Sequence, residues 1–173
     1  LTLTTATSSP GDTITCTATV TDDDATPASD SKSASIDVQN SDPTVDSVII
    51  THTDSTVTTD TDLVCSATAS DADGGSPDVT YAWSNGSTEL DALSDDGDDS
   101  TLTLTPSSVS PEDIVQCEAT ATDSDGAVAT GSDTVEIDNT APTVDSVTIS
   151  YEGDAVTTSS TLTCAAAASD ADG

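Results

Sequence analysis

The sequence repeats itself with a period of about 100 residues. The stretch LTLTTATSSPGDTITCTATVTDDD, which begins at Leu1, matches LTLTPSSVSPEDIVQCEATATDSD, which begins at Leu102, at almost every apolar position. The separation is 101 residues there and 99 residues farther on, where NSDPTVDSV at 40–48 recurs as NTAPTVDSV at 139–147. A period of this length predicts a tandem array of similar domains.

The repeat divides the chain into three parts. Residues 1–42 form the C-terminal part of one repeat, 43–141 form a complete repeat, and 142–173 form the N-terminal part of the next. We therefore expect these residues to be a segment of a longer chain. Exchange of the two partial repeats between copies is the less favoured alternative, because the hybrid would lack the third strand, which carries Trp83.

Apolar residues alternate along short stretches of the complete repeat, and this alternation predicts β-strands. Strands are expected at 45–51, 62–70, 78–84, 100–105, 113–122 and 127–138. Asn85-Gly86 favours a two-residue hairpin turn after the third of them. No stretch predicts a helix, and no run of about 18 apolar residues predicts a membrane span. The expected fold class is all-β, with tandem β-sandwich repeats of about 100 residues joined by short Pro-containing linkers.

The order Cys65, Trp83, Cys117 resembles the immunoglobulin fold, with an inward Cys on the second strand, an inward Trp on the third and an inward Cys on the sixth. One departure is Val115, which stands where the immunoglobulin pattern has a Tyr. The stretch YAWSNGS is similar to the Tyr-x-Trp of polycystic-kidney-disease-type repeats, but the Gly-Asp-Gly turn that follows in them is absent. The resemblance implies an Ig-like repeat of the kind found in bacterial and archaeal surface proteins.

The four cysteines have three interpretations: disulfides, buried thiols or zinc ligands. Zinc is disfavoured, because there is no Cys-x-x-Cys pair and the single His52 matches no ligand spacing. The immunoglobulin resemblance implies a Cys65–Cys117 bridge between the two sheets, with buried thiols as the alternative. A bridge implies an oxidising, extracellular compartment. Cys16 and Cys164 belong to different repeats, so we expect them to pair outside this segment and not with each other.

The charge of the chain is strongly unbalanced, with 33 acidic residues, one Lys or Arg and a formal net charge of −32. Such a chain has almost nothing with which to bind the phosphate backbone of a nucleic acid or an anionic lipid surface. Its self-repulsion weakens a compact fold unless salt or bound cations screen it. The composition therefore fits a generic acidic surface protein, a set of divalent-cation sites, or both.

Acidic turns lie where such cation sites are expected. In an Ig-like sandwich, SDADGGSPD after the second strand and TDSDGAVA after the sixth emerge at the end where the linker enters. The linker EIDNTAPTVDS resembles the Asp-Asn-x-Ala-Pro joint of cadherins, which implies calcium between consecutive domains. Calcium accepts six to eight oxygen ligands in flexible geometry. The candidate ligands are Asn40, Asp42, Asp71, Asp73, Asp123 and Asp125 at one joint, and Asp138, Asn139, Asp170 and Asp172 at the next. Solvated turns that satisfy their own backbone are the alternative, and another ion is a third.

Other candidate sites are few. Asn85-Gly86-Ser87 is an N-glycosylation sequon on the expected hairpin tip, although the turn alone explains Asn-Gly. The Ser- and Thr-rich composition also allows O-glycans. Glu112 and Asp113 are adjacent and are expected to diverge at a solvated corner. No nucleophile elbow, phosphate loop or metal-hydrolase motif is present, so we expect no catalytic residue and no enzymatic activity.

The expected function is structural. Disulfide-linked Ig-like repeats joined by short linkers predict a stiff extracellular stalk or filament, whose partners are neighbouring repeats or copies of itself. The alternatives are an adhesive module that binds sugars or proteins, and an accessory repeat of a secreted enzyme.

Overall fold

A computed structural model describes residues 1–91 and 99–173, and in these residues the chain forms eleven strands and no helix. The all-β expectation is confirmed. Seven strands form the central unit: β3 (Thr44–His52), β4 (Asp62–Ser70), β5 (Asp78–Asn85), β6 (Thr88–Asp91), β7 (Asp99–Thr103), β8 (Ile114–Thr122) and β9 (Val128–Glu136). Two hairpins flank it: the N-terminal ribbon, β1 (Thr13–Thr21) and β2 (Ser29–Asp37), and the C-terminal ribbon, β10 (Thr143–Tyr151) and β11 (Leu162–Ser169).

The central unit consists of two antiparallel sheets, with strand orders β3-β4-β7 and β6-β5-β8-β9. Each strand turns alternate side chains inward, as the period of two requires. β4 buries Leu63 and Cys65, β5 buries Tyr81 and Trp83, and β8 buries a matching series that includes Cys117. The buried residues form one hydrophobic core, an arrangement consistent with a β-sandwich.

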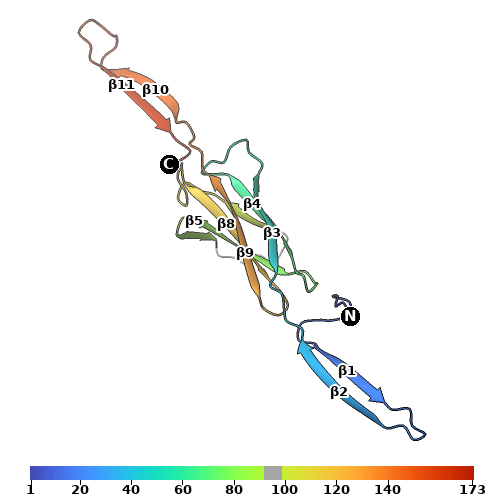
Figure 1. Ribbon diagram of the computed structural model, residues 1–173. Coiled ribbons are helices and arrows are strands. Elements are labelled where there is room, and N and C mark those ends of the chain that lie inside the picture. The colour runs from blue at the N-terminus through green and yellow to red at the C-terminus, as the bar shows by residue number, and fades with distance from the viewer. Residues whose placement is uncertain (92–98) are drawn as a thin grey trace.

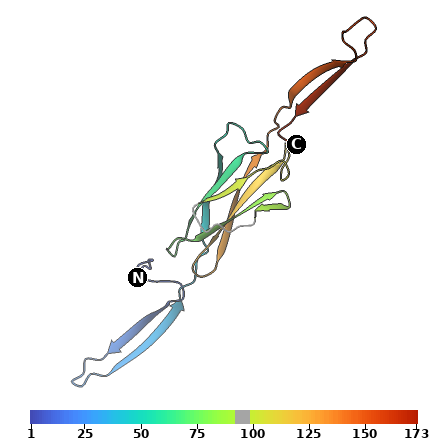
Figure 2. The same ribbon diagram turned by 180° about the vertical axis from the view of Figure 1, so that it is seen from behind.

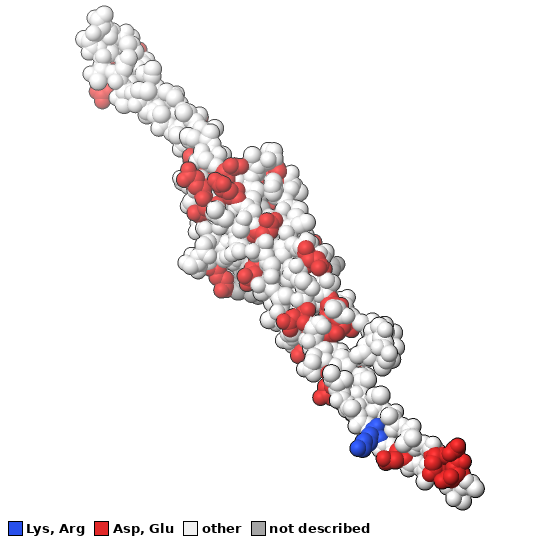
Figure 3. Space-filling model, in the orientation of Figure 1, with Lys and Arg blue, Asp and Glu red and all other residues white. Residues whose placement is uncertain are grey.

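The two ribbons extend from opposite ends of the central unit, so the molecule is long and narrow (Figure 1, Figure 2). Acidic side chains are spread along its length, and the one basic residue of the chain, Lys32, lies on the N-terminal ribbon (Figure 3). No helix in the described residues is long and apolar enough to cross a membrane.

The strand pairing of each ribbon repeats a pairing of the central unit. In the C-terminal ribbon Ile149 pairs with Cys164, as Ile50 pairs with Cys65 in β3–β4, and both hairpins have an irregularity at the same place, 99 residues apart. The N-terminal ribbon matches β8–β9 in the same way: Thr13 pairs with Asp37 and Thr21 with Ser29, as Ile114 pairs with Glu136 and Thr122 with Val128. The loop between β1 and β2 is two residues longer than the loop between β8 and β9, which explains why the separation changes from 101 to 99.

The ribbons differ from the central unit in exposure. Val147 and Ile36 are 62% and 72% exposed, whereas the residues at the same register positions in the central unit, Val48 and Val135, pack against its core. Each ribbon therefore shows to solvent a face that the central unit covers with its second sheet.

Candidate functional site

The first candidate feature is a disulfide between the two sheets of the central unit. Cys65 of β4 and Cys117 of β8 are joined with an S–S distance of 2.04 Å, and both are fully buried. Trp83 pairs with Cys117 across β5 and β8, and its Nε1–H donates to Ser100 Oγ at 3.1 Å. The bridge implied by the sequence resemblance is present, and the buried-thiol alternative is wrong for this pair.

The other two cysteines, Cys16 and Cys164, are exposed thiols on the two ribbons. They occupy the register positions of Cys117 and Cys65, respectively. They do not pair with each other within the chain. Their pairing with cysteines outside this segment remains a prediction.

The acidic turns meet the linker that leads from the N-terminal ribbon into the central unit. Asn40 Nδ2 donates to Asp123 Oδ2 at 2.9 Å, which joins the linker to the loop between β8 and β9. The backbone N–H of Ser41 donates to Asp73 Oδ2, and its hydroxyl lies 3.4 Å from Asp73 Oδ1. The structure thus brings Asn40, Asp73 and Asp123 to one joint, through direct hydrogen bonds.

Each turn also satisfies its own backbone. Asp73 N–H donates to Asp71 Oδ1 at 2.8 Å, and the N–H groups of Asp125 and Ala127 donate to Asp123 Oδ1 at 2.9 and 2.8 Å. The bond from Asn40 lowers the pKa of Asp123 below its usual value; burial opposes this shift, and the backbone N–H groups of the loop support it. Asp123 is therefore held as a carboxylate by donors of the protein itself.

The next joint repeats one of these contacts. Thr140 N–H donates to Asp172 Oδ2 at 2.6 Å, and both residues lie 99 positions after Ser41 and Asp73. Asp172 Oδ1 also accepts from Thr59 Oγ1 at 3.0 Å, and Thr59 is fully buried in the loop between β3 and β4. The turn that follows the C-terminal ribbon is thereby bonded both to the linker and to the central unit.

The remaining predicted ligands do not gather around a common point. Asp42, Asp125, Asp138, Asn139 and Asp170 are exposed, and Asp71 is occupied with the N–H of Asp73. Residues 1–91 and 99–173 contain no group of three or more His, Cys, Asp or Glu side chains that could hold a metal ion. One observation fits a cation: Asn40 Oδ1 is buried and has no hydrogen-bond donor among the described residues.

Sequence reasoning missed the donors at these joints. The sequence-based expectation named only oxygen ligands from the linkers and did not include the backbone N–H groups of Ser41 and Thr140, which donate to Asp73 and Asp172. The signal was present in the sequence, because Asp73 and Asp172 stand at the same place in the repeated SDADG. The sequence did not reveal that the carboxylates of Asp73 and Asp172 accept hydrogen bonds from the linkers.

The sequon residue is also engaged in a structural contact. Asn85 Nδ2, the atom that a glycan would occupy, donates to Asp113 Oδ2 at 2.7 Å. The hairpin turn lies one residue later than expected, since Asn85 pairs with Thr88 and the two loop residues are Gly86 and Ser87. Gly86 has a φ of 59°, the left-handed conformation that the first position of this loop requires.

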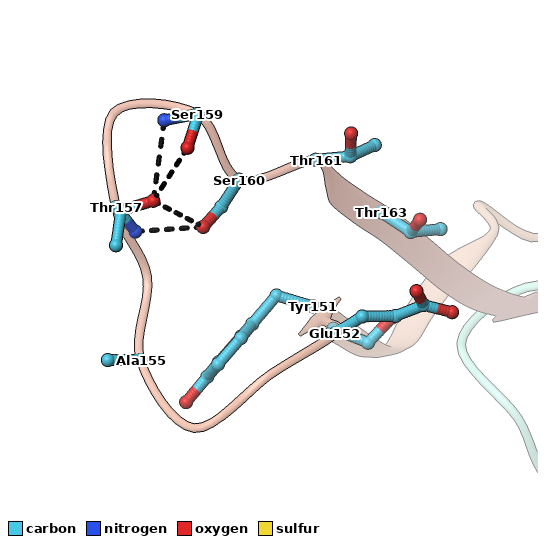
Figure 4. Close-up of a pocket in the computed structure, with 9 residues that line it drawn as sticks. Tyr151, Glu152, Ala155, Thr157, Ser159, Ser160, Thr161 and Thr163 are labelled. Atoms are coloured by element: carbon cyan, nitrogen blue, oxygen red, sulfur yellow. Dashed lines mark hydrogen bonds between the residues drawn. The ribbon is translucent and has the colours of Figure 1, made fainter.

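A hollow of about 770 Å³ lies at the tip of the C-terminal ribbon, between Tyr151 on one side and the loop from Thr157 to Ser160 on the other (Figure 4). Hydroxyl groups of that loop bond one another, and the wall is mostly polar. At the equivalent place of the central unit, the N–H of Leu104 donates to Thr61 O at 3.1 Å, and Ser160 is the counterpart of Thr61 in the ribbon.

Comparisons with protein-family models and with curated proteins gave no match to this chain. Its function is therefore inferred from the geometry of the disulfide and of the two joints.

Proposed function

We propose that the chain is a segment of a stiff extracellular stalk or filament, built from tandem Ig-like repeats in a longer chain. The observation that carries the proposal is the bond between an acidic turn and a linker, which recurs 99 residues apart. Ser41 N–H donates to Asp73 at one joint and Thr140 N–H donates to Asp172 at the other. A contact made the same way at successive joints sets the same orientation between successive repeats.

The Ig-like assignment is supported by the central unit. Its seven strands lie in two sheets with a buried Cys on the second strand, a buried Trp on the third and a buried Cys on the sixth. Its strands run from Thr44 to Glu136, within the repeat proposed at 43–141. The flanking ribbons match β8–β9 and β3–β4 in register, which supports partial repeats at 1–42 and 142–173. The Cys65–Cys117 bridge favours an extracellular location, because disulfides persist in oxidising compartments.

The joints are also short and restrained. Only six residues separate the end of β2 from the start of β3, and Pro43 among them is buried. Proline fixes its own φ and restricts the residue before it, so few backbone rotations remain free in the linker. The bonds to Asp73 and Asp123 restrain the rest.

Small-angle X-ray scattering tests the proposal. A compact protein of this length has a radius of gyration of about 16 Å, and the stalk predicts a value well above it with a rod-like distance distribution. Asp172→Ala removes the acceptor of the Thr140 and Thr59 bonds and should shorten the average end-to-end distance through bending at that joint. Asp154→Ala, in the exposed loop of the same ribbon, is the matched control. An Asp172→Ala profile equal to that of the control would refute the stiffening role.

Calcium at the first joint is a second element of the proposal, favoured by the unpaired, buried Asn40 Oδ1. An amide oxygen and nearby carboxylates are ligands of the type that calcium accepts. Binding to the folded state alone would raise the melting temperature of the protein above that of a chelated sample. Equal melting curves with calcium and with chelator would refute the calcium site, and the first joint would then be held by its direct hydrogen bonds alone.

A binding module is less well supported, and an enzymatic role is not proposed. Tyr151 is 46% exposed and borders the hollow at the ribbon tip, and it is the one aromatic side chain among the described residues that line it. A single aromatic residue beside a mostly polar wall is weak support for a ligand site.

A further inference from the structure

The first and last strands of the central unit, β3 and β9, belong to different sheets but lie against each other. Asp133 Oδ2 on β9 accepts the backbone N–H of Ile50 on β3 at 2.9 Å. Two residues earlier on both strands, a Cβ placed on Gly131 would lie 3.2 Å from Val48 Cγ2. The contacts advance together along both strands, so β3 and β9 run in the same direction.

This arrangement determines how tension acts on the central unit. β3 begins where the linker from the N-terminal ribbon ends, β9 ends where the linker to the C-terminal ribbon begins, and the two ribbons extend from opposite ends of the unit (Figure 1). Tension along the chain therefore pulls the start of β3 and the end of β9 apart, parallel to the strands. The two strands must slide lengthwise past each other, so the bonds that hold them are loaded together. The ladders that join β3 to β4 and β9 to β8 are loaded in the same way.

Asp133 is placed to resist this sliding. Its side chain is half-buried, and its second oxygen accepts the N–H of Thr134 at 2.9 Å, which restrains the orientation of the carboxylate. A hydrogen bond to a carboxylate is roughly twice as strong as one between neutral groups. Because the bond to Ile50 joins the two strands on which tension acts, it must break before β3 leaves β9.

The disulfide joins the strands next to this pair. Cys65 belongs to β4, the neighbour of β3, and Cys117 belongs to β8, the neighbour of β9. After β3 and β9 are pulled away, tension passes through the S–S bond, and the chain between the two cysteines, which includes β5, β6 and β7, bears none. About 40 residues of the unit lie outside the bridge, and their extended length is at most about 140 Å.

We propose that the central unit is a tension-bearing element with a fixed limit of extension. The contact between β3 and β9, held by Asp133, bears the load, and the Cys65–Cys117 bridge stops the extension once that contact breaks. This role rests on the proposed stalk function, since a stalk carries tension along its chain. The two are tested separately, because pulling measures the central unit whereas scattering measures the joints.

Single-molecule force spectroscopy on the full chain tests the limit of extension. Both ends carry handles, and a Cys16→Ser, Cys164→Ser background leaves the bridge as the one target of a thiol reductant. Without reductant, we expect the contour length of the central unit to increase in a step of at most about 140 Å. With reductant, a second step of about 180 Å should follow, because the bridge is buried until the first step exposes it.

The second step is a thiol–disulfide exchange. The thiolate of the reductant attacks one sulfur and forms a mixed disulfide, and the other cysteine leaves as a thiolate, which releases the residues between the two cysteines. The flanking ribbons lie outside the bridge and lengthen equally with and without reductant. A single step of about 320 Å without reductant, or no second step with it, would overturn the proposed limit.

Unfolding at constant load tests the role of Asp133. Asp133→Ala removes the acceptor for Ile50 and should make the first step at least about tenfold faster, as expected for the loss of a hydrogen bond to a charged group. Asp133→Asn keeps an oxygen acceptor and should restore most of the lifetime. Asp113→Ala is the matched control, because Asp113 accepts from Asn85 and Ser110 but lies between the bridged cysteines.

The control separates load bearing from general stability. Asp113→Ala should lower the midpoint of urea unfolding but change the rate of the first step by less than about twofold, because its bonds carry no tension. An unchanged rate in Asp133→Ala would overturn the proposal. Equal acceleration by both alanine variants would overturn it as well, because Asp133 would then act through stability alone.

Discussion

Reduction of the Cys65–Cys117 bridge should strongly destabilise the central unit. The bridge closes a loop across 52 residues of sequence. In the chain-entropy model, a loop of that length stabilises the folded state by about 4 kcal/mol at 25 °C, through restriction of the unfolded chain. Small domains have a net stability of only about 5–15 kcal/mol, so the loss is a large fraction of the total.

The expected change in melting temperature follows from the size of the unit. A domain of the length of residues 43–141 has an unfolding entropy of about 0.2 kcal/mol/K, so a loss of 4 kcal/mol lowers the melting temperature by about 20 °C. The core offers little to offset this loss. Trp83 and Tyr81 are the only aromatic residues among its buried side chains in the described part of the chain.

The assay uses the fluorescence of Trp83, which is the single tryptophan of the chain and is buried beside the bridge. A Cys16→Ser, Cys164→Ser background removes the exposed thiols, so that the reductant acts on one bridge only. Because both bridge cysteines are buried, reduction is carried out in denaturant before refolding. A fall of less than about 5 °C, which corresponds to less than about 1 kcal/mol, would refute the entropy calculation.

Three further predictions concern single positions of the central unit. Gly131→Ala should destabilise the central unit by about 1–3 kcal/mol, because the new Cβ would lie 2.8 Å from Val45 Cγ1. Urea unfolding followed by Trp fluorescence measures the change in stability, and an unchanged midpoint would contradict the close approach of β9 to Val45. Glu112→Gly should stabilise the central unit by about 1 kcal/mol in the same assay, since residue 112 has a φ of 72° that suits glycine. A loss of stability would show that the Glu112 side chain stabilises the fold by more than the relief of backbone strain. The lowered pKa of Asp123 contributes stability that is fully present above the usual pKa of 3.8 and is lost as the pH falls through the lower pKa of the folded state. An acid titration of the melting temperature should show this loss of stability, and Asn40→Ala should make the loss smaller. Identical titration curves for the wild type and Asn40→Ala would exclude the Asn40 bond as the cause of the lowered pKa.

Most of the fold was predictable because it follows from the alternation of apolar residues. The expected strand at 62–70 coincides with β4, and the expected strand at 113–122 begins one residue before β8. Inward positions such as Leu63 and Val115 are buried because the pleat fixes which side chains share a face. The hairpin turn was predicted at Asn85-Gly86 but lies one residue later, at Gly86-Ser87. Both residue pairs suit a two-residue turn, and only the pairing of Asn85 with Thr88 distinguishes them.

The joints were less predictable, because a carboxylate has several kinds of partner and sequence does not say which one is near. Asp73 and Asp123 were correctly placed at the linker, but as expected ligands of a cation. The structure shows N–H donors to both, which the sequence did not predict, and their role as cation ligands stays a prediction. Thr59, which bonds Asp172, is separated from it by more than one hundred residues of sequence. No local pattern identifies such a pair. Gly131 shows the same limit, because only the structure reveals that a Cβ at this position would lie 2.8 Å from Val45 Cγ1.

The Ser and Thr residues supply donors to the carboxylates of a chain that has only one Lys or Arg. With Lys32 as its only Lys or Arg, the protein can neutralise few of its carboxylates with ion pairs, and several of them accept hydrogen bonds from neutral N–H and O–H groups. Ser70 donates to Asp46 and Ser169 donates to Asp145, the same bond at the same place in two hairpins, at 3.1 and 2.9 Å. Such bonds satisfy carboxylate oxygens but leave the negative charge, and the mutual repulsion of 33 acidic groups remains. An elongated molecule reduces this repulsion because charges separated by more than about 8 Å at physiological salt are largely screened. The acidity and the extended shape are therefore linked. A chain that cannot pair most of its charges is stabilised by keeping them apart, and the hydrogen bonds between the linkers and the acidic turns favour the extended arrangement (Figure 3).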